Sequence, residues 1–354
     1  MENGKVVTLS IYIATYNRKE ILRRKLEEIL AVQSQDFDVW VLDDCSDDGT
    51  DDMVKGITDN RIHYIRNEER MGIKADGAMP NWYRLLEACD GRFAFHLNDR
   101  DIFYTEKLIS LIDFLKRHWE CTAGVCDSFT GEKMYTTPEE ALMAIPYKAY
   151  HPTGIIFRTD LYKAIPERTS FFEKETSYIH PHDLVLGKLS EKGEIFHYDK
   201  MFELADKESF ANNKSFYYKK GNEITAWFAP DERLKEFSMF IRHLNSLNFK
   251  KSIKLEKAFK IAKTYLYYCT FNYKYYVTDP GQTKHYGIEK QEFGLGRLFA
   301  CAGAFTEKSA QILKDNKYLE NTTSYKLHLR MYFFAVCIAK PVWDLYKKGA
   351  KRKW

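Results

Sequence analysis

The chain has 354 residues, 45% of them hydrophobic, which suffices for one large globular domain or two of ordinary size. Its 54 lysine and arginine residues nearly balance its 50 aspartate and glutamate residues, so the net charge of +4 gives no overall electrostatic case for a nucleic-acid partner. No apolar run approaches the roughly 18 to 20 residues needed to span a bilayer, the longest late run being 331–339. We therefore expect a soluble or peripheral protein.

The seven cysteines are scattered and lack the close pairing of a zinc or redox site, which favours a reducing compartment. Residues 1–5 run directly into a strand-like segment, without the charged and apolar regions of a signal peptide. Both features predict a cytoplasmic protein.

Strands and helices alternate from the first residues onward. Apolar, β-branched segments predict strands at 6–14, 37–42, 62–65 and 92–97, and helical spacing predicts helices at 19–32, 51–57, 80–89 and 105–119. This alternation implies right-handed crossovers and a mainly parallel sheet. Ligands of such sheets bind beyond the carboxyl ends of the strands. Three polar loops, 15–18, 43–50 and 98–101, are expected to meet at that edge.

The pattern changes near residue 205. Before it, a buried strand is expected at 154–157, a helix within 178–192 and a short strand at 195–198. After it, the chain is rich in lysine, tyrosine and phenylalanine and shows helical spacing, as at 234–247 and 254–268. We predict an α/β domain over 1–205 and a mostly helical C-terminal region over 206–354 that contacts an acceptor or a membrane surface.

The acidic turn after the fourth predicted strand is a candidate metal site. Asp99 and Asp101 are separated by one residue, so both carboxylates can point into one cleft. Two hard oxygen ligands suit Mg²⁺ or Mn²⁺, with diphosphate oxygens and water completing the coordination. Read alone, such a pair is also typical of a solvated turn or a helix cap.

The other two strand-end loops suit a nucleoside. Thr15, Tyr16 and Asn17 place an aromatic ring beside small hydrogen-bonding side chains, as stacking and polar recognition of a base require. The acidic turn 43–50, which includes Asp44, can bind a base or ribose through a carboxylate. Each loop by itself also fits an ordinary turn or cap.

Three segments together resemble the inverting glycosyltransferases of family 2, which have the GT-A fold. They are Ile-Tyr-Ile-Ala-Thr-Tyr-Asn-Arg at 11–18, Val-Leu-Asp-Asp-Cys-Ser-Asp-Asp-Gly-Thr at 41–50 and Cys-Asp-Gly-Arg-Phe-Ala-Phe-His-Leu-Asn-Asp-Arg-Asp at 89–101. The resemblance covers roughly the first 200 residues. It implies a GT-A domain, a nucleotide-sugar donor such as a UDP-sugar, a divalent metal (Mn²⁺ or Mg²⁺), and a hydroxyl acceptor on a glycan, glycolipid or glycoprotein.

The resemblance also implies roles for individual residues. Thr15 and Tyr16 would border the nucleoside, with Asn17 and Arg18 in the same loop, and Asp44 would bond the base. Asp99 and Asp101 would hold the metal and the sugar diphosphate. Asp43 would chiefly support its turn.

Two departures from the family pattern concern the donor. The Ala-Arg-Asn triplet of many relatives reads Met-Pro-Asn at 79–81, which retains Asn81 but lacks the arginine. Lys74 or Arg70 is the candidate to replace its phosphate contact. Arg100 stands where many relatives have an acidic or small residue, and its charge should weaken metal affinity unless it pairs with phosphate.

The general base is expected shortly before a late helix. Family members carry a Glu-Asp pair there, and the corresponding residues in this chain are His182 and Asp183. Asp183 is the predicted base, which takes the proton of the acceptor hydroxyl. Asp183 as an N-cap, and His182 as the base or a metal ligand, are the alternatives. His151 and Thr153, before the strand at 154–157, resemble an acceptor-side loop and are candidate acceptor or metal contacts, or part of an ordinary turn.

The C-terminal stretch 325–354 mixes aromatic and basic residues, a combination suited to an anionic membrane surface. A core-packing helix with a solvated tail is the alternative. The resemblance implies an inverting glycosyltransferase and, as a family expectation, a role in bacterial polysaccharide or glycoconjugate synthesis. A sugar-nucleotide-binding module without catalysis and a sugar nucleotidyltransferase are the other candidates, and the second lacks the expected Gly-rich phosphate loop.

Overall fold

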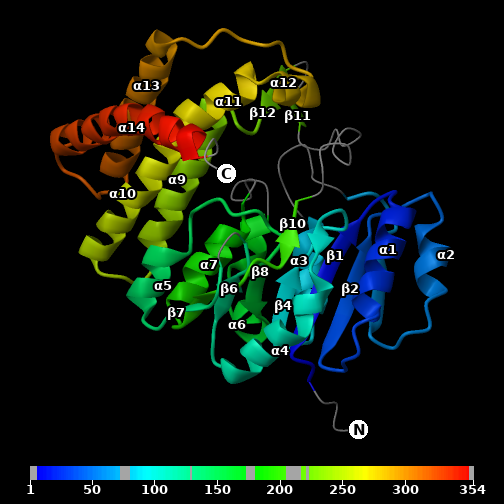
Figure 1. The fold of residues 1–354 in the computed structure, drawn as a ribbon. Helices are drawn as coiled ribbons and strands as arrows, with labels where there is room; N and C mark the ends of the chain where they lie inside the picture. The colour runs from blue at the N-terminus through cyan, green and yellow to red at the C-terminus, as the bar shows by residue number, and fades with distance from the viewer. Residues whose placement is uncertain are drawn as a thin grey trace. The chain divides into compact units, whose positions relative to one another are not determined.

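The structure, a computed structural model, describes residues 6–71, 80–127, 130–172, 180–204, 217–220 and 223–350. The chain divides into two compact units, residues 1–222 and 223–354 (Figure 1). The predicted boundary at 205/206 falls outside the described residues and stays a prediction.

An eight-stranded sheet in the order β3-β2-β1-β4-β8-β6-β9-β7 forms the centre of the first unit. Its strands are β1 (Leu9–Thr15), β2 (Phe37–Asp43), β3 (Ile62–Arg66), β4 (Phe93–His96), β6 (Ala123–Val125), β7 (Lys133–Tyr135), β8 (Ile155–Arg158) and β9 (Ile195–His197). The first four strands are mutually parallel, as is the β6–β9 pair, whereas β8 and β7 run antiparallel to their neighbours. The prediction of a mainly parallel α/β domain followed by helices is confirmed.

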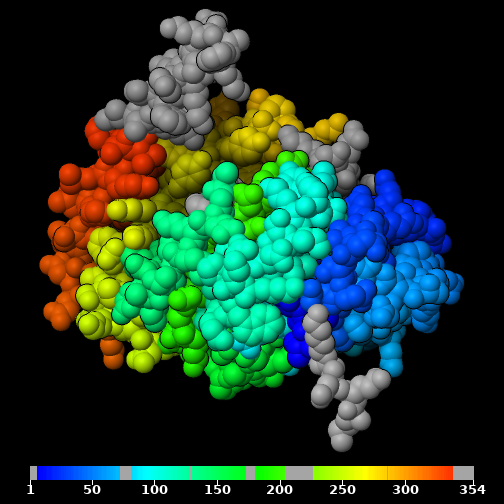
Figure 2. Space-filling view, turned by 60° about the horizontal axis from the view of Figure 1, so that its bottom comes forward, coloured from blue at the N-terminus to red at the C-terminus, as the bar shows by residue number. Residues whose placement is uncertain are grey.

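The helices of this unit connect the strands and cover the sheet. They are α1 (Lys19–Leu30), α2 (Thr50–Lys55), α3 (Pro80–Ala88), α4 (Leu108–Arg117), α5 (Pro138–Ala144), α6 (Thr159–Lys163) and α7 (His182–Ser190), with short 3₁₀ turns at Thr105–Lys107 and Arg168–Phe172. A two-stranded pair joins β5 (Ile102–Phe103) to β10 (Phe202–Glu203). In the space-filling view, the blue, cyan and green segments of this unit form one continuous surface (Figure 2).

The two faces of β1 follow its period of two. Leu9, Ile11 and Ile13 belong to one large apolar cluster with α1 and α4. Tyr12 points to the other face, where its ring contacts His96 of β4 edge to face at 4.8 Å. Trp82 of α3 contacts the same imidazole at 4.6 Å. Both faces of β1 are therefore buried, as expected for a central parallel strand.

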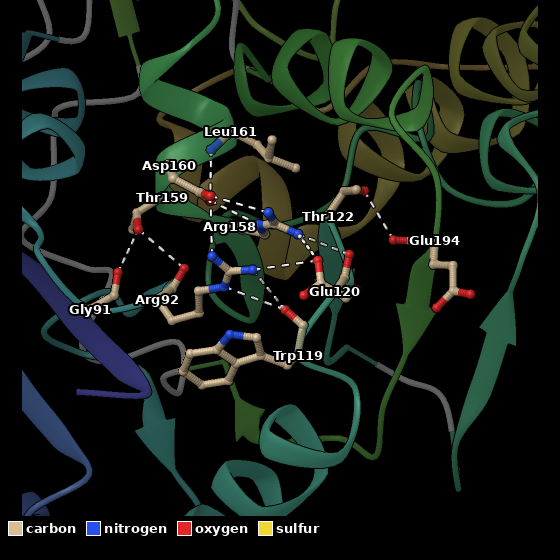
Figure 3. A network of polar contacts seen from close by, with 10 residues as sticks. All are labelled: Gly91, Arg92, Trp119, Glu120, Thr122, Arg158, Thr159, Asp160, Leu161 and Glu194. Atoms are coloured by element: carbon tan, nitrogen blue, oxygen red, sulfur yellow. Dashed lines mark hydrogen bonds and ion pairs between the residues drawn. The ribbon is translucent and has the colours of Figure 1, made fainter. Parts of the chain in front are cut away.

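A charged network lies where β4 begins and β8 ends (Figure 3). Asp160 accepts hydrogen bonds from Arg92 (3.2 Å) and Arg158 (2.8 Å), and Arg158 also contacts Glu120 at 3.0 Å. The Arg92 guanidinium lies 5.1 Å from the centre of the Trp119 ring. This network joins the start of α6 to the segment after α4, at the end of β4 opposite to the acidic turn.

The second unit is mostly helical. After the two-stranded pair of β11 (Tyr217–Lys220) and β12 (Glu223–Ala226), it contains α9 (Pro230–Ser246), α10 (Lys251–Tyr267), a π-helical turn (Tyr268–Asn272), α11 (Tyr273–Thr278), α12 (Pro280–Tyr286), α13 (Leu295–Asp315) and α14 (Thr323–Ala350). Rings of Phe237, Tyr265 and Phe305 meet in its core. Across the described part of the chain, no helix has the length and apolar character that crossing a membrane requires.

Candidate active site

The carboxyl ends of β1, β2 and β4 bring the three predicted loops together. The Asp44 amide donates to the Thr15 carbonyl at 2.9 Å, and the Leu97 amide donates to the Tyr12 carbonyl at 3.1 Å. The loops after these strands therefore begin side by side. These loops contain most of the residues that are predicted for the donor site.

Asp99 is the buried centre of the first cluster. Its carboxylate accepts a hydrogen bond from the Thr15 hydroxyl at 2.9 Å. One guanidinium nitrogen of Arg18 lies 3.1 and 3.0 Å from its two oxygens. The Asp99 side chain is only 3% exposed, whereas Arg18 is 27% exposed, so the arginine reaches inward from the rim of the site. Asp99 thus already binds a cation, supplied by the protein itself.

Asp101 is the centre of the second cluster and is fully buried. The Thr153 hydroxyl donates to its Oδ2 at 2.5 Å, and the Asn98 side-chain amide donates to the same oxygen at 3.2 Å. Nδ1 of His151 lies 3.7 Å from that oxygen. Thr153 also accepts the Asn98 backbone amide at 3.1 Å. The predicted acceptor-side loop therefore contacts the acidic turn directly.

Gly154 allows this contact to form. Its φ of +90° is unfavourable for other residues, and an added Cβ would lie 2.6 Å from the Phe202 ring and 2.8 Å from the Cys126 carbonyl oxygen. Its amide donates to the His96 carbonyl at 3.0 Å, which aligns the loop with the end of β4.

The imidazoles around the acidic turn are neutral near pH 7. Burial lowers the pKa of His151 to about 4; the nearby Asp101 carboxylate opposes the shift, and the charge of Arg100 adds to it. Burial likewise lowers the pKa of His96 to about 3. Arg100, on the same turn, is half-buried.

Asp44 belongs to a separate polar cluster at the ends of β2 and β3. Its Oδ1 accepts hydrogen bonds from the Asn67 side chain (2.7 Å) and the Met71 amide (2.8 Å). Asn67 also donates to the Asn81 side-chain oxygen at 2.8 Å and accepts from Arg84. The buried Asn67 therefore links Asp44 to Asn81.

The nucleoside-side loop is fixed by local hydrogen bonds. Asn17 has a φ of 50°, and its amide donates to the Ser46 hydroxyl at 2.9 Å. Tyr16 is half-buried, and the Arg70 guanidinium lies 4.1 Å from the centre of its ring. Asp43 accepts from the Ser46 amide at 2.9 Å and from the Tyr64 hydroxyl at 2.8 Å, which supports the turn. Lys74 lies outside the described residues.

Asp183 is fully buried at the start of α7 and holds the segment 147–149. Its carboxylate accepts backbone hydrogen bonds from Tyr147 (2.5 Å), Lys148 (3.4 Å) and Ala149 (2.9 Å). Tyr147 and Ala149 have left-handed backbones, with φ of 65° and 54°. Successive amides in such a conformation form a concave anion-binding nest. The loop that contacts Asp101 is therefore held at its other end by Asp183.

His182 is buried beside this loop. Its Nε2 bonds the Tyr150 carbonyl at 2.9 Å, and its Nδ1 has no hydrogen-bond partner in the described part of the chain. Burial, followed by the charge of His180, lowers its pKa well below the usual value. An imidazole this difficult to protonate is a weak proton acceptor.

Asp99 and Asp101 form a donor set of hard oxygens, and the bound Arg18 guanidinium shows that Asp99 attracts a cation. Within the described ranges, no group of three or more His, Cys, Asp or Glu side chains is arranged to hold a metal ion. Two carboxylates suit a metal that is shared with a diphosphate, which would supply the remaining oxygens.

Sequence reasoning missed Asn67 and Asn98. Asn67 directly follows β3, so it was a fourth polar residue at a strand end, and that position was the available signal. Asn98 lay inside the quoted motif. Its side chain became significant only with its 3.2 Å contacts to Asp101 and His96, which depend on the loop conformation.

The family model of glycosyl transferase family 2 matches residues 10–220. Among curated relatives, the chain is 32% identical over 108 residues to an E. coli protein, WfaP, named UDP-Glc:alpha-D-GlcNAc-diphosphoundecaprenol beta-1,3-glucosyltransferase; the match covers 30% of this chain and 41% of WfaP. A second match, at 27% identity, is to TuaG, a teichuronic acid biosynthesis glycosyltransferase of Bacillus subtilis. It covers 32% of this chain and 44% of TuaG. The chain thus spans less than half the length of these two relatives.

A longer match extends over 96% of the chain. This match, at 23% identity, covers 86% of a Campylobacter jejuni protein. That protein is named GalNAc(5)-diNAcBac-PP-undecaprenol beta-1,3-glucosyltransferase. Among solved structures, S. aureus TarS 1-349 superposes with a TM-score of 0.57 at 15% identity, covering 93% of this chain and 92% of that one. Its complex with UDP-GlcNAc gives 0.56 at 15% identity, over 86% and 83%. The likeness confirms the predicted GT-A fold.

Proposed function

The chain belongs to glycosyl transferase family 2, and from that premise we propose that it transfers a sugar, with inversion, from a UDP-sugar to a hydroxyl of a lipid-linked glycan. The observation that carries this proposal is that the turn of Asp99 and Asp101 contacts the loop after β1 through Thr15 and the loop before β8 through Thr153. Two relatives named for diphosphoundecaprenol-linked acceptors, one of them named for a UDP-glucose donor, support the substrate classes.

The proposed donor site uses both polar clusters. Tyr16 and Asp44 bind the nucleoside, since a half-buried aromatic ring and a carboxylate fixed by hydrogen bonds suit stacking and hydrogen bonding to a base. The cationic side chain of Arg70, placed over Tyr16, takes the phosphate contact for which relatives use another arginine. Arg18 contacts Asp99 of the acidic turn and Arg100 belongs to that turn, and both pair with the diphosphate when it binds.

Asp99 and Asp101 are proposed to hold Mn²⁺ or Mg²⁺ together with the donor. When bound, the ion neutralises charge that develops on the departing nucleoside diphosphate. Arg18 occupies Asp99 in this structure, so it must turn away before that carboxylate can accept another cation. Its natural destination is the donor diphosphate.

Asp183 is proposed as the general base. It takes the proton of the acceptor hydroxyl while the oxygen bonds the anomeric carbon and the bond from that carbon to the diphosphate breaks. Because three backbone amides surround its buried carboxylate, the 147–149 segment must shift for a hydroxyl to reach it. His182 is less suited because its imidazole resists protonation.

The acceptor is proposed to be reached at the cytoplasmic face of a bacterial membrane. The basic and aromatic stretch 325–354 supports contact with anionic lipid there. The reaction would then contribute to surface polysaccharide or glycoconjugate assembly.

The test compares three variants with the same chemical change. Asp101→Asn and Asp183→Asn should lower transfer from UDP-sugars by at least about a hundredfold, the usual scale for loss of a general base or a charge-stabilising group. Asp160→Asn, at the opposite end of β4 and β8, should not lower transfer. Unchanged turnover in both site variants contradicts the assigned roles. Nucleotide binding by calorimetry without turnover on any donor or acceptor would instead favour a binding module.

A further inference from the structure

Exposed apolar side chains gather on two neighbouring helices of the second unit. Of the twelve large hydrophobic residues exposed among the described residues, five belong to α13 and α14: Leu295 (70%), Phe299 (47%), Leu327 (58%), Met331 (65%) and Phe334 (59%). On α14 the spacing of Leu327, Met331 and Phe334 places them on one face. Because Tyr325, Leu329 and Phe333 are buried, α14 packs one apolar face and exposes a second.

A groove runs between these two helices. The helices are antiparallel neighbours, since Phe299 contacts Phe333 and Glu307 pairs with both Lys326 and Arg330. Its volume is about 440 Å³, and the lining is Phe299, Ala302, Gly303, Thr306, Arg330, Met331, Phe333 and Phe334. A Cβ built on Gly303 would meet no atom within 4 Å, so the groove is open at its small-residue side.

Positive charge predominates in the sequence of α14 and the residues that follow it. Residues 323–354 contain eight lysine or arginine residues and a single acidic residue, Asp344. Arg330 lines the groove, and together with Lys326 it outnumbers their shared partner Glu307. Apolar side chains beside an excess of cations suit a surface that offers hydrocarbon beneath negative headgroups. A second copy fits less well, because it would bring the same positive charge.

We propose that this face, defined by Leu295, Phe299, Leu327, Met331 and Phe334, docks on an anionic phospholipid bilayer, with the groove receiving an acyl chain. The inference rests on the proposed function for its setting, since an enzyme of lipid-linked glycans works at a membrane. In this proposal, α13 and α14 make the apolar part of the contact, and the basic C-terminal tail contacts the lipid headgroups.

The test is cosedimentation of the full chain with vesicles of phosphatidylglycerol and phosphatidylcholine, and with phosphatidylcholine alone. The protein should bind the anionic vesicles and bind the neutral ones at least tenfold more weakly. Met331→Glu/Phe334→Glu should lose at least tenfold in binding to anionic vesicles, and so should Gly303→Glu, which places a carboxylate in the groove. The control Val6→Glu/Ile109→Glu changes the charge equally at exposed residues of the first unit and should bind like the unmodified chain.

Equal binding by all variants, or no binding to anionic vesicles, overturns the proposal. So does light scattering that shows a dimer which Met331→Glu/Phe334→Glu converts to monomer, since the occupant is then a second copy. Transfer to a water-soluble, short-chain acceptor is measured in parallel. If this transfer persists in the double variant while vesicle binding is lost, both proposals stand. If vesicle binding behaves as expected but the unmodified chain transfers nothing, only the proposed function fails.

Discussion

The contact of Arg18 with Asp99 has a measurable consequence for metal binding. A guanidinium at 3.0 Å satisfies the carboxylate and must be displaced by any other cation. Since a charge-assisted hydrogen bond contributes roughly 1.5 to 3 kcal/mol, Arg18→Gln should raise the Mn²⁺ affinity of the donor-free protein by about tenfold or more. Titration calorimetry measures this without turnover. Arg24→Gln, elsewhere on α1, should leave the affinity unchanged, and equal affinities for all three proteins would contradict the competition.

Thr153 offers a second test at the scale of one hydroxyl. Its oxygen donates to Asp101 and accepts the amide of Asn98, and the side chain is fully buried. Thr153→Val keeps the shape but leaves that amide without its acceptor, so we expect a loss of about 1 to 3 kcal/mol in the free energy of unfolding. Urea unfolding measures it. Thr153→Ser retains the hydroxyl and should recover most of the loss; if it is as unstable as the valine variant, the methyl packing and not the hydrogen bonds is responsible.

At the scale of elements, Asp183 joins α7 to the loop that leads to β8. The left-handed residues Tyr147 and Ala149 are held by this carboxylate, and such conformations persist only where surrounding contacts impose them. Asp183→Asn removes the charge and replaces one acceptor oxygen by a donor. Amide hydrogen exchange at Tyr147 and Ala149 should then become at least tenfold faster. If Asp183 acts in proton transfer alone, turnover falls while the exchange of these amides stays as it was.

The elements of the parallel half of the sheet were predictable because each carries its own signal. β1 and β2 are mostly apolar, buried segments followed by polar loops, β3 is a short segment rich in β-branched and aromatic residues, and α1 has a clear apolar stripe. The sequence had no comparable signal for β6 and β7, each three residues long, or for the antiparallel direction of β8. Strands this short gain their pairing from neighbours far along the chain and not from local preference.

The site shows the same division between local and distant information. Strand ends could be located from the sequence, so Thr15, Asp44, Asp99 and Asp101 were found as candidates. The partner of each carboxylate could not be predicted from the sequence, because Arg18 lies 81 residues from Asp99 and Thr153 lies 52 residues from Asp101. Asp183 was identified because it corresponds to the Glu-Asp pair that family members carry before a helix. Its three contacts with 147–149 depend on backbone conformations that the residue types there do not predict.

At the scale of the whole molecule, the two units are expected to respond differently to acid. The first unit contains His96, His151, His182 and His197, and burial lowers the pKa of each, to about 3 for His96, about 4 for His151 and His197, and well below the usual value for His182. Among the described residues of the second unit, burial lowers the pKa of His328, whose side chain is much less buried than those of the four histidines in the first unit.

The sign of the effect follows from linkage. An unfolded histidine protonates near pH 6.5, whereas these four stay neutral in the fold until the pH is much lower, so the unfolded state binds more protons as the pH falls. The free energy of unfolding should be unaffected by these groups above about pH 7 and should fall steadily from pH 6.5 to 4. Urea unfolding at half-unit pH steps, monitored by hydrogen exchange, should show the first unit opening before the second. His197→Gln removes one titrating group and should flatten the slope between pH 6.5 and 4, and an unchanged slope would mean that carboxylate pairs dominate the acid response.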